Sequence, residues 1–376
     1  SWQRARDAGV VFSDEPPAQW DFGIDAMLAI GVSRAPEGRM AQWIAALNAG
    51  PPVLAVDVPS GLNADTGQGC ALRAHHTLSL LTLKPGLFTG EGRDAAGEVW
   101  LDTLGLEAAS TDATANLISR STSAPRLHAS HKGSYGDVAV IGGGPGMTGA
   151  ALLAAQASLT HGAGRVFVSL LGASTMAVDA SQPELMLRAW DSLDLSAMAV
   201  ACGCGGGDAV RAVLPWVLSS ARMLVLDADA LNAIAGDSQL ALQLQARARR
   251  QGRSTVITPH PLEAARLLGN STTQVQADRL AAARALAQRF GCVAVLKGSG
   301  TVVVAPGGIP AINPTGNARL ATAGTGDVLA GMVAANMAGG ATAFDAACNA
   351  VHAHGAAADD WPAQKALTAS KLAQRP

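Results

Sequence analysis

The stretch GDVAVIGGGPGMTGAALLAAQASLT, residues 136–160, contains the unit from which the fold is built. Its apolar run at 137–141 predicts a buried strand, a glycine-rich turn follows, and residues 149–160 have a helical pattern. Further strand-like runs lie at 165–170, 223–227, 255–258, 293–297 and 301–304, and further helical patterns at 272–290 and 326–337. This alternation predicts an α/β fold with a doubly wound, largely parallel sheet flanked by helices.

The residues before this stretch are expected to form a second, smaller α/β domain. Apolar runs at 53–57 and 77–83 predict buried parallel strands, and apolar residues at helical spacing predict a helix at 39–48. The segment 108–125 is rich in Ser, Thr and Ala and is predicted to be a linker between domains 1–107 and 126–376. Because the sequence begins at Ser1 in the middle of a pattern, it is expected to be a fragment.

Composition excludes several classes of protein. With 376 residues, 49% hydrophobic and 15% charged, the chain can bury a large core, which rules out disorder as its main state. A formal net charge of -2 gives no reason to expect a nucleic-acid partner. The apolar stretch 328–344 is interrupted by glycines and is shorter than the roughly 20 residues of a membrane span, so no membrane partner is expected. The five cysteines have neither zinc-site nor disulfide spacing, which favours a reducing, cytoplasmic location.

Chemistry in open α/β sheets is expected beyond the carboxyl ends of the strands. Glycine-rich loops at 142–149 and 203–208 precede helices, where free amides can bind an anion, although each loop can equally be a tight strand–helix turn. His260 follows a strand, where it can contact a ligand or simply be a structural histidine. Lys297-Gly298-Ser299-Gly300-Thr301 can hold phosphate, or form a hairpin turn, or do both.

The most informative cluster is Gly324-Thr325-Gly326-Asp327, which opens a predicted helix. Amides at a helix start, together with the helix dipole, suit charge that develops on a transferring phosphoryl group. Asp327, in the first turn, is then placed to take a proton from a substrate hydroxyl. The alternative is that Asp327 only complements the dipole. The small residues around it favour the functional interpretation.

The first segment contains a weaker candidate site. Asp57-Val58-Pro59-Ser60-Gly61 closes a strand, while Asp25 precedes a loop with Gly31, Val32, Ser33 and Arg34. Two carboxylates, a hydroxyl and an Arg-bearing loop can bind a monovalent cation and a phosphate. The two aspartates can also be strand-end caps.

In combination, these motifs resemble a known family. GDVAVIGGGPGMTGAA, TPHPLEAARLL, KGSGT and NARLATAGTGDVLAG, within residues 126–376, are similar to the ADP-dependent NAD(P)H-hydrate dehydratases of the ribokinase-like superfamily. The first segment resembles the C-terminal half of NAD(P)H-hydrate epimerase domains, which are Rossmann-like. The resemblance is therefore to the bifunctional nicotinamide-nucleotide repair enzymes.

The resemblance implies that ADP drives loss of water from the S epimer of hydrated NADH or NADPH, giving AMP, phosphate and the restored cofactor, while the epimerase interconverts the R and S epimers. Mg²⁺ is the expected divalent ion, K⁺ the ion of the epimerase part, and a homo-oligomer is expected. The implied roles, in this numbering, are Asp327 as the base; Lys297, Gly298, Ser299, Gly300, Thr301 and Gly326 at the nucleotide; Ala150, Gly207, His260 and Asp327 at the hydrated substrate; Gly31, Val32, Ser33, Arg34 and Asp57 at the epimerase substrate; and Asp25 and Ser60 at potassium.

Two departures from the family pattern matter. Cys204 stands where the family usually has proline, which makes the transfer of roles to Gly205 and Gly207 less secure. The Asn-Asn-Gly-Gly-Asp loop and first strands of the epimerase domain are not found. The epimerase half is therefore expected to be inactive or poorly folded unless residues precede Ser1.

Two other interpretations remain open from the sequence. A small-molecule kinase of the thiazole or hydroxymethylpyrimidine type shares Gly-Thr-Gly-Asp, but it would use ATP and release a phosphorylated product. A nucleotide-binding regulator without turnover is disfavoured by the intact Asp327.

Overall fold

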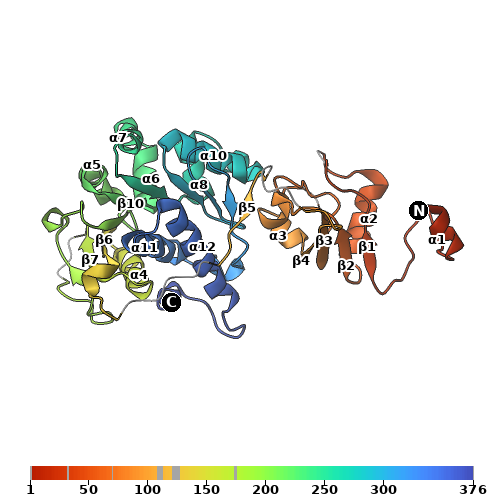
Figure 1. Cartoon of the computed structure of the whole chain (residues 1–376), viewed down its shortest axis with the longest axis horizontal. Coiled ribbons are helices and arrows are strands. Elements are labelled where there is room, and N and C mark those ends of the chain that lie inside the picture. The colour runs from red at the N-terminus through yellow and green to blue at the C-terminus, as the bar shows by residue number, and fades with distance from the viewer. Residues whose placement is uncertain are drawn as a thin grey trace. The chain divides into compact units, whose positions relative to one another are not determined.

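The computed structural model describes residues 2–31, 34–69, 71–107, 113–120, 128–172 and 176–375. The chain divides into two compact units, Ser1–Ser110 and Thr111–Pro376 (Figure 1). The predicted linker 108–125 is partly wrong, because its residues 116–117 form strand β5 (Asn116–Leu117), which pairs with β14 (Ala311–Ile312) in the larger unit. A strand of two residues is too short to produce an apolar pattern.

The smaller unit is a four-stranded parallel sheet in the order β1-β2-β3-β4. Its elements are α1 (Trp2–Asp7), β1 (Gly23–Asp25), α2 (Gly38–Asn48), β2 (Val53–Val56), β3 (His76–Leu80), η1 (Pro85–Phe88), α3 (Gly92–Ala95) and β4 (Glu98–Asp102). Two apolar clusters stabilise it, one around Leu62 and Leu87 and one around Ile44 and Leu72. The expectation that this segment is poorly folded is therefore wrong, since its described residues form a sheet with its own buried core.

The larger unit contains a ten-stranded sheet in the order β5-β14-β13-β12-β11-β10-β9-β6-β7-β8. The remaining strands are β6 (Asp137–Gly142), β7 (Arg165–Leu170), β8 (Met186–Leu187), β9 (Ala199–Cys202), β10 (Met223–Leu226), β11 (Ser254–Ile257), β12 (Val293–Leu296) and β13 (Val302–Val304). Strands β6 to β12 run parallel, and β13 turns back antiparallel to β12. The doubly wound fold class predicted from the sequence is confirmed.

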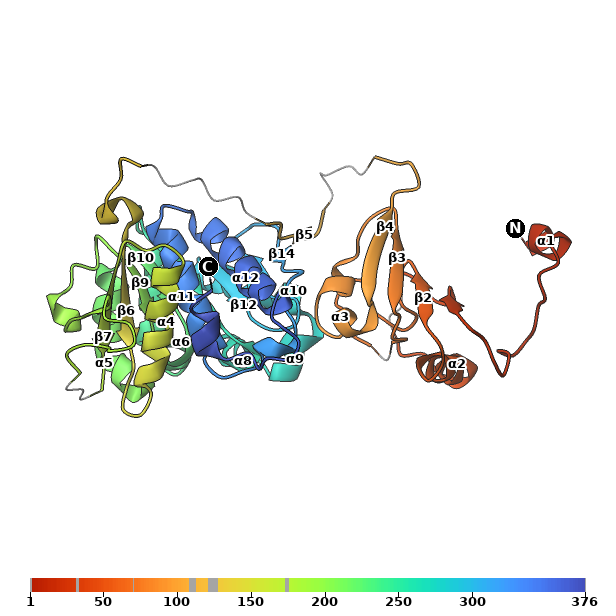
Figure 2. The same ribbon diagram turned by 90° about the horizontal axis from the view of Figure 1, so that it is seen from below.

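Helices cover both faces of this sheet (Figures 1 and 2). The helices of the unit are α4 (Thr148–Thr160), α5 (Val210–Ser220), α6 (Ala228–Ala235), α7 (Ser238–Ala248), α8 (Pro261–Leu268), α9 (Thr272–Ala277), α10 (Arg279–Phe290), α11 (Thr325–Ala338), α12 (Ala343–Asp359) and α13 (Ala369–Leu372). Helices α4, α11 and α12 pack together and on the strands, while α5 to α8 and α10 form the other layer. The helix predicted at 272–290 is two helices, because Asp278 has extended backbone and caps α10 through Ala281 N at 2.8 Å.

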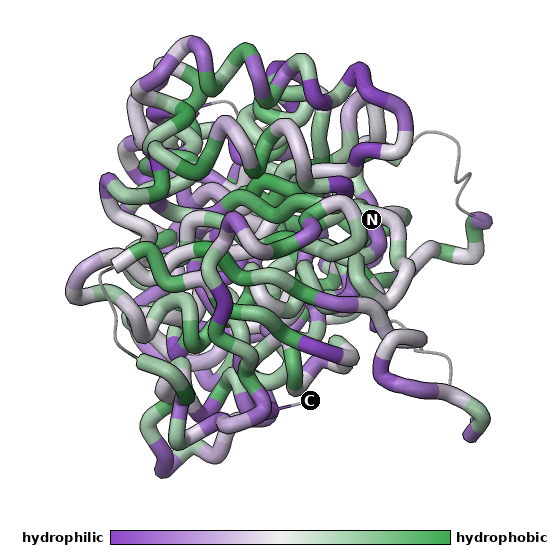
Figure 3. Tube along the Cα trace, turned by 90° about the vertical axis from the view of Figure 1, so that its left-hand side faces the viewer, coloured by the Kyte–Doolittle hydropathy of each residue, from purple (hydrophilic) through white to green (hydrophobic). Residues whose placement is uncertain are grey.

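The core of the larger unit lies between the sheet and α4 and α11, where apolar segments run through the middle of the fold (Figure 3). Helices α4 and α11 approach closely at Gly331, where an added Cβ would lie 2.0 Å from the carbonyl oxygen of Ala154. Ser158 Oγ donates to the Gly331 carbonyl at 3.0 Å and ties the helices together. This contact fixes the position of α11, whose first turn carries Asp327. No described helix is both long enough and apolar enough to cross a membrane.

Candidate active site

Of the predicted site residues of the larger unit, Ala150 follows β6, Gly207 follows β9, His260 follows β11 and the loop from Lys297 follows β12, all parallel strands of one sheet. Gly326 and Asp327 lie in the first turn of α11, which comes after β14 in the chain. The two glycine loops that follow β6 and β9 are in direct contact. Gly143 N donates to the Cys204 carbonyl at 2.9 Å, and Gly144 N donates to the Gly205 carbonyl at 2.6 Å. A Cβ at Gly142 would lie 2.3 Å from the Cys204 oxygen. Glycine is needed here because one backbone lies directly on another.

The predicted substrate residues Ala150 and Gly207 lie beside this loop pair. A Cβ on Gly205 would come within 2.7 Å of the Ala150 Cβ, so the β9 loop packs on the start of α4. Gly207 has a φ of 54°, and its N–H donates to Asp229 Oδ2 at 2.8 Å. Asp229, in the first turn of α6, thus holds the loop that carries Gly207.

The start of α11 provides amides at the edge of the sheet. Gly324 begins the helix in the left-handed region, with a φ of 89°. The N–H of Thr325 is occupied by the Thr322 carbonyl at 3.3 Å, and its hydroxyl donates to Leu320 O at 2.8 Å. Among the described residues, no acceptor within the protein lies on the amides of Gly326 and Asp327. The anion hole expected at this helix start is therefore formed by the amides of Gly326 and Asp327, because the amide of Thr325 is already occupied.

Asp327 has the electrostatics of a general base. Its pKa is raised to about 7, mainly by burial and next by the charge of Asp227, while Cys204 and the charge of Lys297 act in the opposite direction. A carboxylate with a pKa near neutrality combines sufficient basicity with substantial ionisation at neutral pH. Its side chain is only partly buried, so the carboxylate can reach a ligand.

Lys297 forms an ion pair with Asp227, a residue that sequence reasoning did not select. The ammonium lies 2.6 Å from Asp227 Oδ1, which also accepts a hydrogen bond from Thr258 Oγ1 at 2.9 Å. Burial alone would lower the pKa of Lys297, but the charges of Asp227 and Glu263 raise it overall, so the ammonium is retained. A Cβ at Gly326 would lie 3.3 Å from Lys297 Nζ, which brings the predicted nucleotide residues 297 and 326 together.

The loop after Lys297 is held by Arg279, another residue not found from the sequence. The Arg279 side chain is buried, and its Nη2 donates to the carbonyls of Leu296 and Lys297, both at 3.1 Å. Thr301 Oγ1 donates back to Gly298 O at 3.1 Å. The alternative of a hairpin turn is correct as to shape, since β13 returns antiparallel to β12. The Arg279 side chain holds the turn from its buried side, and Gly298 and Ser299 remain exposed where a ligand can reach them.

His260 caps helix α8. Its Nδ1 accepts hydrogen bonds from Leu262 N and Glu263 N at 3.1 and 3.4 Å, while Glu263 Oε2 accepts from His260 N at 2.8 Å. Burial, followed by the charge of Lys297, lowers the pKa of His260, so its ring is neutral at neutral pH. With Nδ1 occupied, Nε2 is the nitrogen that carries the proton, and it lies 3.3 Å from Glu263 Oε1.

His354 supports the start of α11 from helix α12. It is buried, and its Nε2 lies 2.9 Å from the Thr325 carbonyl, to which it donates. Burial lowers its pKa to about 4. A histidine in an apolar helix gives no sequence signal of this contact, because the acceptor is 29 residues away.

Asp227 and Glu263 are the residues best suited to Mg²⁺. Both are buried carboxylates, and burial is the main cause of the raised pKa of Glu263, which the charge of Lys297 opposes. Carboxylate oxygens are ligands that Mg²⁺ accepts, with phosphate oxygens and water completing its shell. The donor set therefore fits a magnesium–nucleotide complex.

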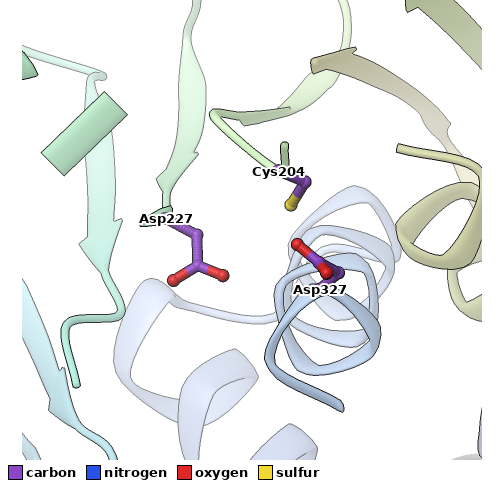
Figure 4. A group of neighbouring side chains, drawn as sticks. All are labelled: Cys204, Asp227 and Asp327. Atoms are coloured by element: carbon purple, nitrogen blue, oxygen red, sulfur yellow. The ribbon is translucent and has the colours of Figure 1, made fainter. Parts of the chain in front are cut away.

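Cys204, Asp227 and Asp327 form a second cluster, whose ligand atoms lie within 4.8 Å of one another (Figure 4). Burial, followed by the charges of the two aspartates, raises the pKa of the Cys204 thiol well above its usual range. The thiol is therefore protonated, and Lys297 already neutralises Asp227. These properties do not favour a resident soft metal ion.

Comparisons with known proteins identify the family of the chain. The family model described as NAD(P)H-hydrate dehydratase matches residues 138–375. The chain belongs to the NAD(P)H-hydrate dehydratase family. A bifunctional NAD(P)H-hydrate repair enzyme of Escherichia coli (strain K12) is 39% identical over 91% of this chain and 68% of its own length. An ADP-dependent (S)-NAD(P)H-hydrate dehydratase of Neisseria meningitidis serogroup B is 43% identical over 66% of this chain and 84% of its own length.

Solved structures place the larger unit in the same family. The ADP/ATP-dependent NAD(P)H-hydrate dehydratase from Bacillus subtilis, co-crystallized with ATP and Mg²⁺, has a TM-score of 0.55 and 30% identity, covering 66% of this chain and 90% of its own. A ribokinase-like superfamily protein from Enterococcus faecalis V583, at 24% identity and a TM-score of 0.58 over 72% of this chain and 96% of its own, supports the fold. The ribokinase-like fold class is confirmed.

The smaller unit matches the family model described as YjeF-related protein N-terminus over residues 1–86. The expectation that this part is inactive or poorly folded is therefore not supported. Asp25 is buried, and it accepts hydrogen bonds from Ser60 N at 2.7 Å and Ser60 Oγ at 2.6 Å. The predicted pair of potassium ligands is thus adjacent. Of the expected substrate loop, Gly31 and Arg34 are exposed, whereas Val32 and Ser33 lie outside the described residues.

Asp57 occupies a strained position at the end of β2. Its φ is 71°, which is costly for a residue other than glycine. Lys84 forms an ion pair with Asp57 and donates to the Leu80 carbonyl at 2.7 Å. The alternative that Asp57 caps a strand end is also met, because its Oδ1 accepts from Leu80 N at 3.0 Å.

Proposed function

We propose that the larger unit uses ADP to dehydrate the S epimer of hydrated NADH or NADPH, giving NAD(P)H, AMP and phosphate. The observation that carries this proposal is Asp327, with a pKa of about 7, at a helix start where the Gly326 and Asp327 amides have no acceptor among the described residues. Family membership and the dehydratase relatives support the choice of substrate.

The proposed chemistry makes a poor leaving group into a good one. Asp327 takes the proton of the hydroxyl on the hydrated ring, and the hydroxyl oxygen attacks the β-phosphorus of ADP, which releases AMP. The ring nitrogen then donates its electron pair as the carbon–oxygen bond breaks and phosphate departs. Loss of a proton from the neighbouring carbon restores the ring double bond. The Gly326 and Asp327 amides are placed to stabilise charge on the transferred phosphoryl group.

The nucleotide is proposed to lie along the loop 297–301 and Gly326. Lys297 supplies positive charge, while Arg279 keeps the loop backbone in position. Asp227 and Glu263 would hold Mg²⁺, which supplies charge neutralisation for the phosphates. Ala150 at the start of α4, Gly207 after β9 and His260 after β11 are proposed to contact the hydrated substrate.

An assay with purified hydrated NADPH tests this function directly. The protein is incubated with the substrate, ADP and Mg²⁺, and the return of the near-ultraviolet absorbance of reduced nicotinamide is followed together with AMP and phosphate. One AMP and one phosphate per restored NADPH are expected. Restoration without AMP formation, or no restoration with either ADP or ATP by folded protein, would refute the proposal. A stable phosphorylated product made from ATP would instead indicate a small-molecule kinase.

The smaller unit is proposed to interconvert the R and S epimers, with K⁺ at Asp25 and Ser60 and substrate near Asp57 and the loop 31–34. The buried Asp25–Ser60 pair and the match to the YjeF-related family support this proposal. With excess dehydratase activity, the R epimer should be consumed faster in KCl than in a matched tetramethylammonium chloride buffer. Asp25→Asn should abolish this difference. Equal consumption in both salts would exclude potassium from the reaction.

A further inference from the structure

The loop that carries Gly207, residues 203–207, lies against the turn between β10 and α6. A Cβ on Gly203 would come within 2.1 Å of the Asp227 carbonyl oxygen, and the Gly203 carbonyl accepts from Asp229 N at 3.3 Å. At the other end of the loop, Gly207 N donates to Asp229 Oδ2 at 2.8 Å. Asp229 therefore contacts both ends of the loop, one end with its backbone and the other with its carboxylate.

The bond to Gly207 differs from the other bonds of this loop because it depends on a side chain. The middle of the loop is held by backbone atoms, since the carbonyls of Cys204 and Gly205 accept from amides of the loop after β6. Asp229 lies in the first turn of α6, and its side chain is half-buried. A single carboxylate thus fixes the end of the loop that leads into α5, and substitution of this one residue can release it.

Gly207 has an uncommon backbone conformation and lies next to the start of α4. Its φ of 54° is in the left-handed region that favours glycine, whose backbone also has the greatest freedom to move. A Cβ on Gly207 would lie 3.5 Å from Met147 Cε, at the beginning of the helix that carries Ala150. Loss of the carboxylate would leave the partly buried N–H of Gly207 without this acceptor, which costs free energy. Gly207 is then expected to move relative to Met147 and Ala150.

We propose that Asp229 is a positioning residue for the hydrated nicotinamide nucleotide, because it holds Gly207 beside the start of α4. This inference rests on the proposed function, in which Gly207 and Ala150 contact the substrate. Asp229 acts through Gly207 and needs no contact with the substrate. An oxygen that accepts from Gly207 N is required for this role and a negative charge is not, so asparagine should replace Asp229 with little loss.

The test compares Asp229→Ala, which removes the acceptor, with Asp229→Asn, which keeps an oxygen acceptor without the charge. Alanine is a good helix former, so the first variant should fold. Asp237→Ala is the matched control, because Asp237 follows the other end of α6 and its carboxylate accepts from Gln239 N at 2.8 Å as the cap of α7. The control therefore loses a similar bond away from the loop 203–207.

Three measurements are made on the full chain. Hydrogen exchange of peptides that span residues 203–209 reports on the amide of Gly207. Steady-state assays give kcat and the KM values for hydrated NADPH and for ADP. The dissociation constant of NADPH, the restored cofactor, is measured without ADP through the fluorescence of its reduced nicotinamide.

Asp229→Ala should exchange the amide of Gly207 faster than wild type. It should raise both KM for hydrated NADPH and the dissociation constant of NADPH by about 5–10-fold, the effect of losing one hydrogen bond. The kcat and the KM for ADP should change by less than about twofold, because the loop 297–301 is not affected. Asp229→Asn should stay within about threefold of wild type throughout, and Asp237→Ala should lower stability without changing either KM.

Unchanged binding of both nicotinamide nucleotides by Asp229→Ala would overturn the proposal, as would a loss confined to kcat or to the KM for ADP. Equal impairment of Asp229→Asn and Asp229→Ala would also overturn it. If that impairment came with a higher requirement for Mg²⁺, the carboxylate would be a metal ligand instead. The exchange and NADPH-binding measurements need no turnover, so a failure of the dehydratase assay remains distinguishable from a failure of this inference.

Discussion

Replacing Asp327 with asparagine should abolish most activity while making the larger unit more stable. Burial is the main cause of the raised pKa of this carboxyl group, from 3.8 to about 7. Between these two values the folded protein binds a proton that the unfolded chain does not, so the stability of the fold falls as pH rises through this window. Above pH 7, the ionised carboxylate thus lowers the free energy of unfolding by up to about 4 kcal/mol.

Asparagine avoids this cost because it carries no charge at any pH. It also gives up the favourable interaction of an acidic residue with the helix dipole, roughly 0.3–1 kcal/mol, which leaves an expected gain of about 3 kcal/mol at pH 8. The gain should shrink by roughly 2–3 kcal/mol on going to pH 5, where the wild-type carboxyl is protonated in the folded state. The rate of dehydration should fall by about 10²–10⁴-fold, the typical effect of losing a general base.

The stability change is measured by urea unfolding of the full chain at pH 8 and pH 5, with hydrogen exchange of α11 peptides as the readout. The rate is measured with the NADPH-hydrate assay. Asp208→Asn is the control, because Asp208 lies in the neighbouring loop with a fully exposed side chain. It should change neither stability nor its pH dependence. If Asp327→Asn is no more stable than wild type at pH 8, or if its advantage is independent of pH, the carboxylate is not held in the unfavourable environment described above.

Three further predictions test the groups that support the site. The pKa of His354 is lowered from 6.5 to about 4, so the stability that its neutral ring contributes is lost as the pH falls from about 6.5 to 4. The difference in free energy of unfolding between wild type and His354→Gln, measured with urea, should therefore shrink by about 2 kcal/mol between pH 7.5 and 5. Gly331→Ala should lower the melting temperature strongly, because its Cβ would lie 2.0 Å from Ala154 O, whereas Gly340→Ala, with no atom within 4 Å, should cost only the strain of its φ of 97°. Arg279→Met should raise KM for ADP severalfold with a smaller effect on kcat, because the loop 297–301 loses its buried donors; an unchanged KM would remove Arg279 from the account.

The placement of the site could be predicted from the sequence because it follows from topology. Apolar runs revealed the parallel strands, and the rule that ligands bind beyond their carboxyl ends selected the loops that carry Gly207, His260, Lys297 and Asp327. The structure places the loops of Gly207, His260 and Lys297 after β9, β11 and β12 of one parallel sheet, whereas the loop before Asp327 follows β14. The glycine-rich turns indicated that the backbone passes close to another group, and the structure shows such an approach at Gly142, where a Cβ would clash with the facing loop.

The pairing of side chains could not be predicted in the same way. Lys297 and Asp227 are 70 residues apart, and the loop carbonyls that Arg279 binds lie 17 and more residues after it. Such contacts depend on the register and spacing of β10, β11 and β12, for which a single sequence gives no signal. Asp227 ends a predicted strand and could have been selected by the strand-end rule, whereas Arg279 lies in a helix and could not.

The pairing of Lys297 with Asp227 is what makes the position of Asp327 useful. Asp227 and Asp327 both interact with the ammonium of Lys297, and the 2.6 Å contact assigns that ammonium mainly to Asp227. Asp327 is left with burial and a neighbouring negative charge, both of which raise its pKa, opposed by a thiol and a more weakly acting lysine. If the ammonium were bound to Asp327 instead, the carboxylate would be stabilised and would be a weaker base. The basicity of Asp327 therefore depends on a contact made by two other residues, one after β10 and one after β12.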